Sequence, residues 1–233
     1  MVIFINDRPI RLIKKSKHNN FPPMEDYDVI LDARLKPIKI ADFKGHTCLL
    51  NIGPDQMEKI ITELHADKPF DFHSVYILTD QKKELKKRIC SLYQVVEAAG
   101  GVVLNTKQEV LWIYRLGKWD LPKGKLEKNE KFKNAAVREV FEECNVAANL
   151  QSKVCTTYHT YSFKNERILK KTKWYVMDST QMGKLKPQLE ENIERVEWIP
   201  QDKMNKAVSD TYSSIRYVIQ QFIVNQSQIP SKV

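Results

Sequence analysis

The sequence predicts an α/β protein in two parts: a small α/β domain over residues 1–90 and a second α/β domain over residues 91–233. Three observations support this fold class. In the first part, short apolar runs alternate with amphipathic stretches, as strands and helices alternate in α/β folds. After residue 90, a strand interrupted by two glycines begins, which indicates a new sheet. The second part then places one helix between strands and another at its end.

The first 90 residues contain a predicted hairpin and two buried strands. "VIFIND" and "RLIKK" are strand-like runs with a short gap between them, which predicts the hairpin. "HTCLLNIG" and "FHSVYILTD" are mainly apolar and end in turn residues. We therefore expect both to lie inside a sheet.

Two helices complete this first domain. "PDQMEKIITELHA" begins with Pro54, which suits a first helical turn, and its apolar face carries Met57, Ile60, Ile61 and Leu64. "QKKELKKRICSLYQ" follows, with Asp80 as its expected N-cap and a buried stripe of Leu85, Ile89 and Leu92. The domain contains no catalytic constellation, so three roles stay open for it: packing, recognition and homodimer formation.

The second domain reads as a sheet with two helices. Gly100 and Gly101 in "QVVEAAGGVVLN" indicate a bulge or a close backbone approach, and "EVLWIYR" is the next strand. We expect "WDLPKGKLEKNE" to be irregular because of its proline and glycine, and residues 131–144 to be helical. The remaining strands are "KVCTTYHTYSF", "KTKWYVMDS" and "ERVEWIP", and "DKMNKAVSDTYSSIRYVIQQFI" is one closing helix.

Composition narrows the class of protein. The formal net charge is +9 and is spread over both parts, so a solvated surface explains most of it and we expect no nucleic-acid partner. No apolar run approaches the ~20 residues that a membrane span needs. The four cysteines form no CxxC pair and the five histidines show no zinc spacing. These features predict a cytoplasmic protein with reduced thiols and no zinc.

The helix at residues 131–144 has an unusual charge pattern. Glu139 and Glu143 fall on one side of it, with Glu142 at the edge of the same patch, beside an apolar stripe. The positions four residues after these glutamates are Glu143, Val146 and Ala147, so no lysine or arginine offsets their repulsion there. A solvated acidic face remains an alternative, but clustered carboxylates on a rigid helix suit Mg²⁺ or Mn²⁺.

The spacing of this segment resembles the Nudix box, G-x5-E-x7-R-E-U-x-E-E-x-G-U, where U is a bulky aliphatic residue. Eight of the nine defined positions match in "GKLEKNEKFKNAAVREVFEECNV". The exception is Asn145, which stands where the family has glycine. Asparagine tolerates left-handed geometry better than other non-glycine residues, so a helix C-cap there is still expected. The matching residues are Gly124, Glu130, Arg138, Glu139, Val140, Glu142, Glu143 and Val146.

The resemblance implies a fold and a set of roles. It implies an α/β/α sandwich with a mixed sheet for the second domain, and hydrolysis of a phosphoanhydride with Mg²⁺ or Mn²⁺. By position, Glu139 and Glu143 would bind the metal, Glu142 would be a further ligand or the general base, and Arg138 would hold the acids, with Glu130 as the remaining box acid. A loop base is the alternative, and "QLEENIE" offers Glu190, Glu191 and Glu194.

Substrate identity follows less directly from the sequence. "WDLPKGKLEKNE" is similar to the Leu-Pro-Lys-Gly form of the box found in Nudix enzymes for dinucleoside polyphosphates, capped RNA or diphosphoinositol phosphates. We expect Lys118, Lys123 and Lys125 to contact a polyphosphate, and Tyr161 to stack on a base, although a sheet position is the alternative for this tyrosine. Dinucleoside polyphosphate is favoured. Diphosphoinositol polyphosphate, ADP-ribose and a non-catalytic nucleotide sensor stay open.

Overall fold

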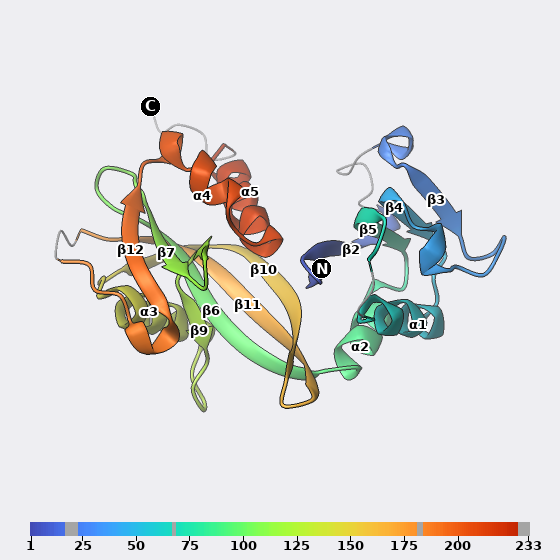
Figure 1. Ribbon diagram of the computed structural model, residues 1–233, viewed down its shortest axis with the longest axis horizontal. Helices are drawn as coiled ribbons and strands as arrows, with labels where there is room; N and C mark the ends of the chain where they lie inside the picture. The colour runs from blue at the N-terminus through green and yellow to red at the C-terminus, as the bar shows by residue number, and fades with distance from the viewer. Residues whose placement is uncertain (17–22, 67–68, 181–183, 228–233) are drawn as a thin grey trace. The chain divides into compact units, whose positions relative to one another are not determined.

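The computed structural model describes residues 1–16, 23–66, 69–180 and 184–227. The chain forms two compact units (Figure 1). Unit 1 comprises Met1–Val95 and Tyr158–Lys170, and unit 2 comprises Val96–Thr157 and Lys171–Val233. Unit 1 is therefore assembled from two separate stretches of the sequence.

Unit 1 contains the predicted hairpin, β1 (Val2–Ile5) and β2 (Arg8–Lys14). Its other strands are β3 (Val29–Asp32), β4 (Gly45–Leu50) and β5 (Phe72–Thr79), which follow β2 in the order β2-β5-β4-β3 and pair in parallel. On the other side, β1 pairs in parallel with the end of β10, at Tyr158 and His159. The sheet of unit 1 is thus mixed.

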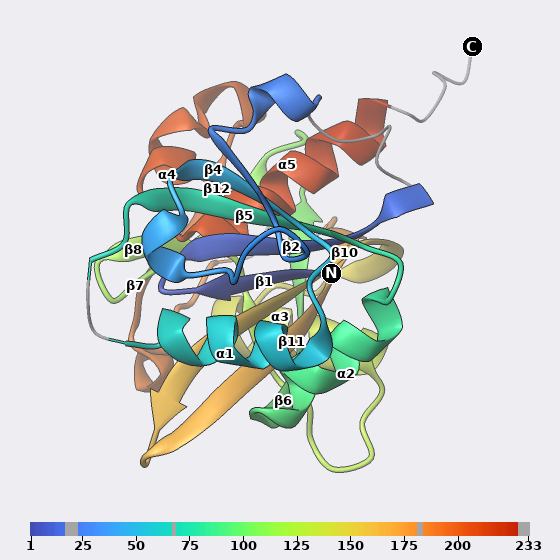
Figure 2. The ribbon, with the colours of Figure 1, turned by 90° about the vertical axis from the view of Figure 1, so that its right-hand side faces the viewer.

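Two helices cover one face of this sheet (Figure 2). In α1 (Pro54–Leu64) the four predicted apolar side chains are buried, and in α2 (Lys82–Ser91) Leu85 and Ile89 are buried. Each fully buried aliphatic side chain of this kind contributes ~1.5–3 kcal/mol. The expected N-cap of α2 is wrong, because Gln81 occupies that position and Asp80 instead lies 3.6 Å from the Lys15 ammonium.

Unit 2 has the expected sandwich. Its strands lie in the order β12-β7-β6-β11-β10, and one apolar cluster packs α3 on one face while another packs α5 on the opposite face (Figure 1). The strands are β6 (Gln94–Leu104), β7 (Val110–Arg115), β10 (Asn149–Phe163), β11 (Glu166–Asp178) and β12 (Ile193–Ile199). The helices are α3 (Phe132–Cys144), α4 (Asn205–Ser209) and α5 (Ser213–Ser227). No helix of the described chain is long and apolar enough to cross a membrane.

Two sequence expectations for this unit were wrong. "WDLPKGKLEKNE" is not irregular throughout, because it begins within β8 (Lys118–Asp120), which pairs with β7, and contains β9 (Lys123–Lys125), which pairs with β6. The closing helix is broken into α4 and α5 around Thr211, whose hydroxyl donates to the Trp119 carbonyl. A close backbone approach at Gly100 is confirmed, since a Cβ there would overlap the Pro122 carbonyl.

Candidate active site

Helix α3 directs two carboxylates into the protein. Glu139 is 9% exposed and Glu143 is 2% exposed, whereas Glu142 lies on the outer side of the helix. The predicted apolar stripe was Phe132, Ala136, Val140 and Cys144; the last three are buried and Phe132 is partly buried. The helix ends at Asn145, whose φ of 57° is left-handed, so the expected C-cap forms without glycine.

The turn between β8 and β9 closes over the two buried acids. The Lys123 N–H donates to the Glu143 Oε2 at 2.9 Å. Gly124 lies directly against the Glu139 carboxylate, and a Cβ at this glycine would overlap all three atoms of that group. The φ of Gly124 is not positive. The site therefore requires a glycine here for space and not for backbone conformation.

Arg138 gathers three of the box acids. Its Nε and Nη2 donate to the two carboxylate oxygens of Glu130 at 2.9 and 2.8 Å. Its Nη1 donates to Glu139 at 2.9 Å and to Glu142 at 2.7 Å. The hydrogen bonds between Arg138 and Glu130 are the main reason that the pKa of Arg138 is raised and the pKa of Glu130 is lowered. The guanidinium thus fixes the acids relative to one another with charge-assisted bonds.

A second arginine approaches the site from β7. Arg115 Nη1 lies 3.9 Å from Glu143 Oε1, and its Nη2 lies 3.8 Å from Glu191 Oε2. Glu191 belongs to the loop that follows β11, and its side chain is 56% exposed. Of the three loop acids expected as alternative bases, this is the one that the structure links to Glu143.

The carboxyl of Glu143 has an unusual environment. Burial raises its pKa to about 7, while Lys123 and Arg115 act in the opposite direction. A buried carboxyl with nearby cations is common at functional sites. Among the described residues, however, no three His, Cys, Asp or Glu side chains converge closely enough to hold a metal ion. Glu139 and Glu142 are turned toward Arg138, and Glu143 toward the Lys123 amide.

The expected substrate residues occupy different places. Lys125 is exposed on β9, and the Lys118 ammonium lies 4.0 Å from Asp210 Oδ1. The Lys123 ammonium is paired with the buried Asp120. Tyr161 belongs to unit 1, where its ring stacks on His159 with centroids 5.5 Å apart.

Two further lysines gather at the start of α3. Lys173 Nζ lies 3.6 Å and Lys171 Nζ 5.1 Å from the centroid of the Phe132 ring. Lys171 also pairs with Glu97 at 2.8 Å. The pKa of Lys173 is lowered, first by burial and then by Lys171 and Lys153. This group of Lys153, Lys171 and Lys173, which we call the β10–β11 lysine cluster, places like charges near one another, and Glu97 offsets part of that charge.

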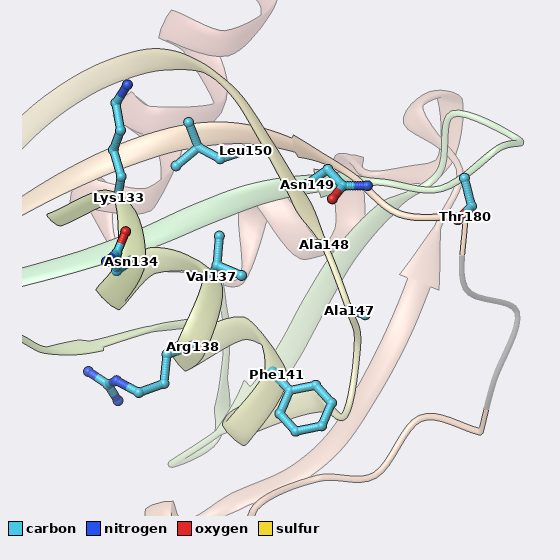
Figure 3. Close-up of a pocket in the computed structure, with 10 residues that line it drawn as sticks. All are labelled: Lys133, Asn134, Val137, Arg138, Phe141, Ala147, Ala148, Asn149, Leu150 and Thr180. Carbon is cyan, nitrogen blue, oxygen red and sulfur yellow. The ribbon is translucent and has the colours of Figure 1, made fainter. Parts of the chain in front are cut away.

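The outer side of α3 borders a groove of about 670 Å³ (Figure 3). Its lining includes the apolar residues Val137, Phe141 and Leu150, and none of the described residues that line it is acidic. Glu139 and Glu143 point inward from the same helix and do not line this groove.

Sequence reasoning missed two charged residues of the site, Arg115 and Asp120. Each had a weak signal. Arg115 is the basic end of an apolar strand, and Asp120 stands three residues before Lys123 in "WDLPKG". Their roles depend on contacts with residues that are distant in the sequence or hidden in a tight turn, so neither signal was specific.

Comparison with known families decides the assignment. The profile of the NUDIX domain matches residues 95–222, which is more than half of the chain. The chain belongs to the NUDIX domain family. Its box helix is α3, and all the site residues just described lie within residues 95–222, although Tyr161 belongs to unit 1.

Individual relatives of this Nudix domain are distant. A Bacillus subtilis (strain 168) protein named "Putative 8-oxo-dGTP diphosphatase" is 37% identical over 70 residues, which cover 29% of this chain and 46% of that relative. The chain thus spans less than half the length of this curated relative. A C. elegans Ap4A hydrolase structure is 20% identical, with a TM-score of 0.46 over 57% of this chain and 98% of that one. A MutT protein from Methanosarcina mazei Go1 is 18% identical, with a TM-score of 0.44 over 57% and 96%.

Proposed function

We propose that the protein is a Mg²⁺- or Mn²⁺-dependent pyrophosphohydrolase that cleaves a phosphoanhydride bond in a nucleoside diphosphate derivative or polyphosphate. One observation carries this proposal: α3 holds two nearly buried carboxylates, Glu139 and Glu143, one helical turn apart beneath a tight turn. Burying carboxylates is costly unless cations or hydrogen bonds compensate. The family membership supports the same activity.

These residues fit a hard divalent cation. Glu139 and Glu143 supply carboxylate oxygens from a rigid helix, and the absence of a Cβ at Gly124 leaves the space that the Glu139 carboxylate occupies. They would hold the metal, with Glu142 as a further ligand. When bound, the metal would neutralise charge on the phosphate oxygens and make a bound water more acidic. Arg138 would keep the acids in register, as its four carboxylate contacts indicate.

Two residues are candidates for the general base. Glu142 is exposed and is held by Arg138, so it can accept a proton from water at the helix surface. Glu191 reaches the site through Arg115. Glu191→Gln distinguishes them: kcat falls if Glu191 is the base and stays near the wild-type value if Glu142 is the base, whereas Glu142→Gln would also lower kcat through its role as a metal ligand.

We propose a polyphosphate as the substrate class, with dinucleoside polyphosphates favoured. The β10–β11 lysine cluster lies at the start of α3, and Glu139 follows Phe132 by seven residues, which is ~10 Å along a helix. A chain of several phosphates can reach both the acids and the lysines, whereas a sugar diphosphate is too short to engage both. Lys118 and Lys125 would add charge along β8 and β9.

A second candidate is an oxidised nucleoside triphosphate, because the Bacillus subtilis relative is named for 8-oxo-dGTP. Hydrolysis of a diphosphoinositol polyphosphate, hydrolysis of ADP-ribose, and nucleotide sensing without hydrolysis are less favoured functions of the same site. The compartment that we propose is the cytoplasm, which agrees with four free cysteines. We propose no catalytic group within residues 1–90.

The test is product release by the full chain with Mg²⁺ or Mn²⁺, over a panel of a dinucleoside tetraphosphate, 8-oxo-dGTP, ADP-ribose and a diphosphoinositol phosphate. We expect hydrolysis that EDTA abolishes and the highest kcat/KM for the dinucleoside tetraphosphate. Glu127→Gln is the matched control for the Glu142→Gln and Glu191→Gln variants, because Glu127 is an exposed acid in the loop that precedes α3. If the wild type binds these ligands but hydrolyses none, the protein is a sensor and the enzymatic proposal is wrong.

A further inference from the structure

The turn over the acids contains a buried ion pair that the box does not include. Asp120 is 4% exposed, and the Lys123 side chain is 11% exposed. The Lys123 ammonium contacts Asp120 Oδ2 and also lies 3.4 Å from the Leu121 carbonyl. The other carboxylate oxygen of Asp120 accepts the Leu121 N–H at 2.7 Å. The pair therefore closes the turn onto itself through three contacts.

A buried pair of this kind needs an explanation other than stability. Removing two charges from water costs about as much as their attraction returns, so such pairs stabilise folds weakly. They do fix geometry, because both partners are held to one arrangement. Here the backbone adds to that restraint: the Gly101 N–H donates to the Pro122 carbonyl at 3.1 Å, and β9 is in register with β6.

The turn restrains the backbone amide of Lys123, which contacts Glu143. Its N–H donates to Glu143 Oε2 at 2.9 Å, and this is the nearest donor to that carboxylate among the described contacts. The amide cannot be removed by a side-chain substitution. Its direction, however, depends on the turn, which the pair between Asp120 and Lys123 restrains together with the backbone bonds to β6.

We infer that Asp120 and Lys123 form a positioning pair that orients Glu143 toward the metal. This inference rests on the proposed function, because it assigns Glu143 as a metal ligand. It gives Lys123 a task other than contacting substrate phosphate. Outer partners of metal ligands commonly change metal affinity by ~10–100-fold when they are removed.

The direction in which one substitution changes the Mn²⁺ affinity distinguishes a positioning role from a simple electrostatic effect. Lys123→Met removes a positive charge near the metal, so electrostatics alone predicts tighter Mn²⁺ binding. Positioning predicts binding that is ~10-fold weaker. The double variant Asp120→Asn/Lys123→Met has no net change in charge, so electrostatics predicts the wild-type affinity. Positioning predicts an affinity as weak as that of either single variant, because both disrupt the same pair.

The experiment measures Mn²⁺ affinity by electron paramagnetic resonance on the full chain without substrate. Four variants are compared: the two single variants, the double variant and Lys123→Arg. Lys128→Met is the matched control, since it removes the same charge from an exposed position in the next loop. Its Mn²⁺ affinity should equal that of the wild type, and Lys123→Arg should restore most of the affinity.

A second readout follows the turn itself. Hydrogen exchange of the Lys123 amide should accelerate in Asp120→Asn and stay slow in Lys128→Met, which also reports whether each variant is folded. If Lys123→Met binds Mn²⁺ as tightly as the wild type or tighter, the positioning role is wrong and the proposed function stands. If the wild type binds no Mn²⁺, the metal-dependent function itself is wrong.

Discussion

Gly124→Ala tests the geometry of the candidate site with the smallest available change. A methyl group at this position would overlap the carboxylate carbon and both oxygens of Glu139. Because the φ of Gly124 is not positive, alanine adopts this backbone without strain. Any loss of activity therefore arises from displacement of Glu139 or of β9.

The size of the effect follows from contact distances. Non-bonded heavy atoms pack at about 3.5–4.0 Å, and the added Cβ would lie well inside that limit for all three carboxylate atoms. Glu139 or β9 must then move by on the order of 1 Å. A misplacement of 1 Å in a catalytic constellation costs ~100-fold in rate, which is ~2.7 kcal/mol of transition-state stabilisation.

The assay is Mg²⁺-dependent hydrolysis of the preferred substrate, together with urea unfolding of the same samples. We expect kcat/KM to fall ~100-fold in Gly124→Ala. Gly117→Ala is the control: its φ is +74°, and apart from its chain neighbours no described residue has an atom within 4 Å of the added Cβ. That variant should lose ~1 kcal/mol of stability and keep wild-type kinetics. Wild-type kcat/KM in a folded Gly124→Ala protein would show that the contact with Glu139 has no catalytic role.

Further predictions concern charge, pH and the helix cap. Glu143→Gln should lower kcat at least ~100-fold, since it removes a metal-ligand charge and keeps the shape; a fully active variant refutes that assignment. The ratio of kcat/KM for a dinucleoside tetraphosphate to that for ADP-ribose should fall as the salt concentration rises, because salt screens the attraction between the lysines and the longer phosphate chain. A ratio that does not depend on salt would contradict a role of these lysines in substrate binding. Burial lowers the pKa of His65 in the folded protein, so as pH falls below ~6.5 the unfolded chain binds a proton before the folded one does. The free energy of unfolding should therefore decrease with falling pH. In urea titrations at several pH values, His65→Gln should make this decrease smaller. Asn145→Ala should cost ~1–2 kcal/mol at its left-handed φ, while Asn145→Gly should change stability by less than ~0.5 kcal/mol in thermal melts.

The sequence predicted the parts of the site that one helix determines. The spacing of Arg138, Glu139 and Glu143 placed them on α3, and the apolar stripe beside them set which side is buried. Asn145 was also predictable, because few residues tolerate its φ. These features depend on neighbours within a turn or two, which periodicity captures.

The remaining features depend on contacts between distant residues. β8 and β9 exist because β7 and β6 pair with them, and this pairing overrides the proline and glycine in their sequence. The break between α4 and α5 is set by Trp119, far back in the chain. Arg115 reaches Glu143 and Glu191 only after three separate segments have folded together. No local pattern contains such information.

The split composition of unit 1 has a consequence for biosynthesis. β1 leaves the ribosome well before its partner in β10, which lies near Tyr158, and before Leu169, which completes the same apolar cluster. Residues 1–95 must therefore wait, with one strand edge unpaired and part of their core uncovered, until residues 158–170 have been translated. Such edges recruit other chains. We expect refolding yield to fall with protein concentration, and nascent chains halted before residue 158 to bind chaperones more strongly than those halted after residue 170.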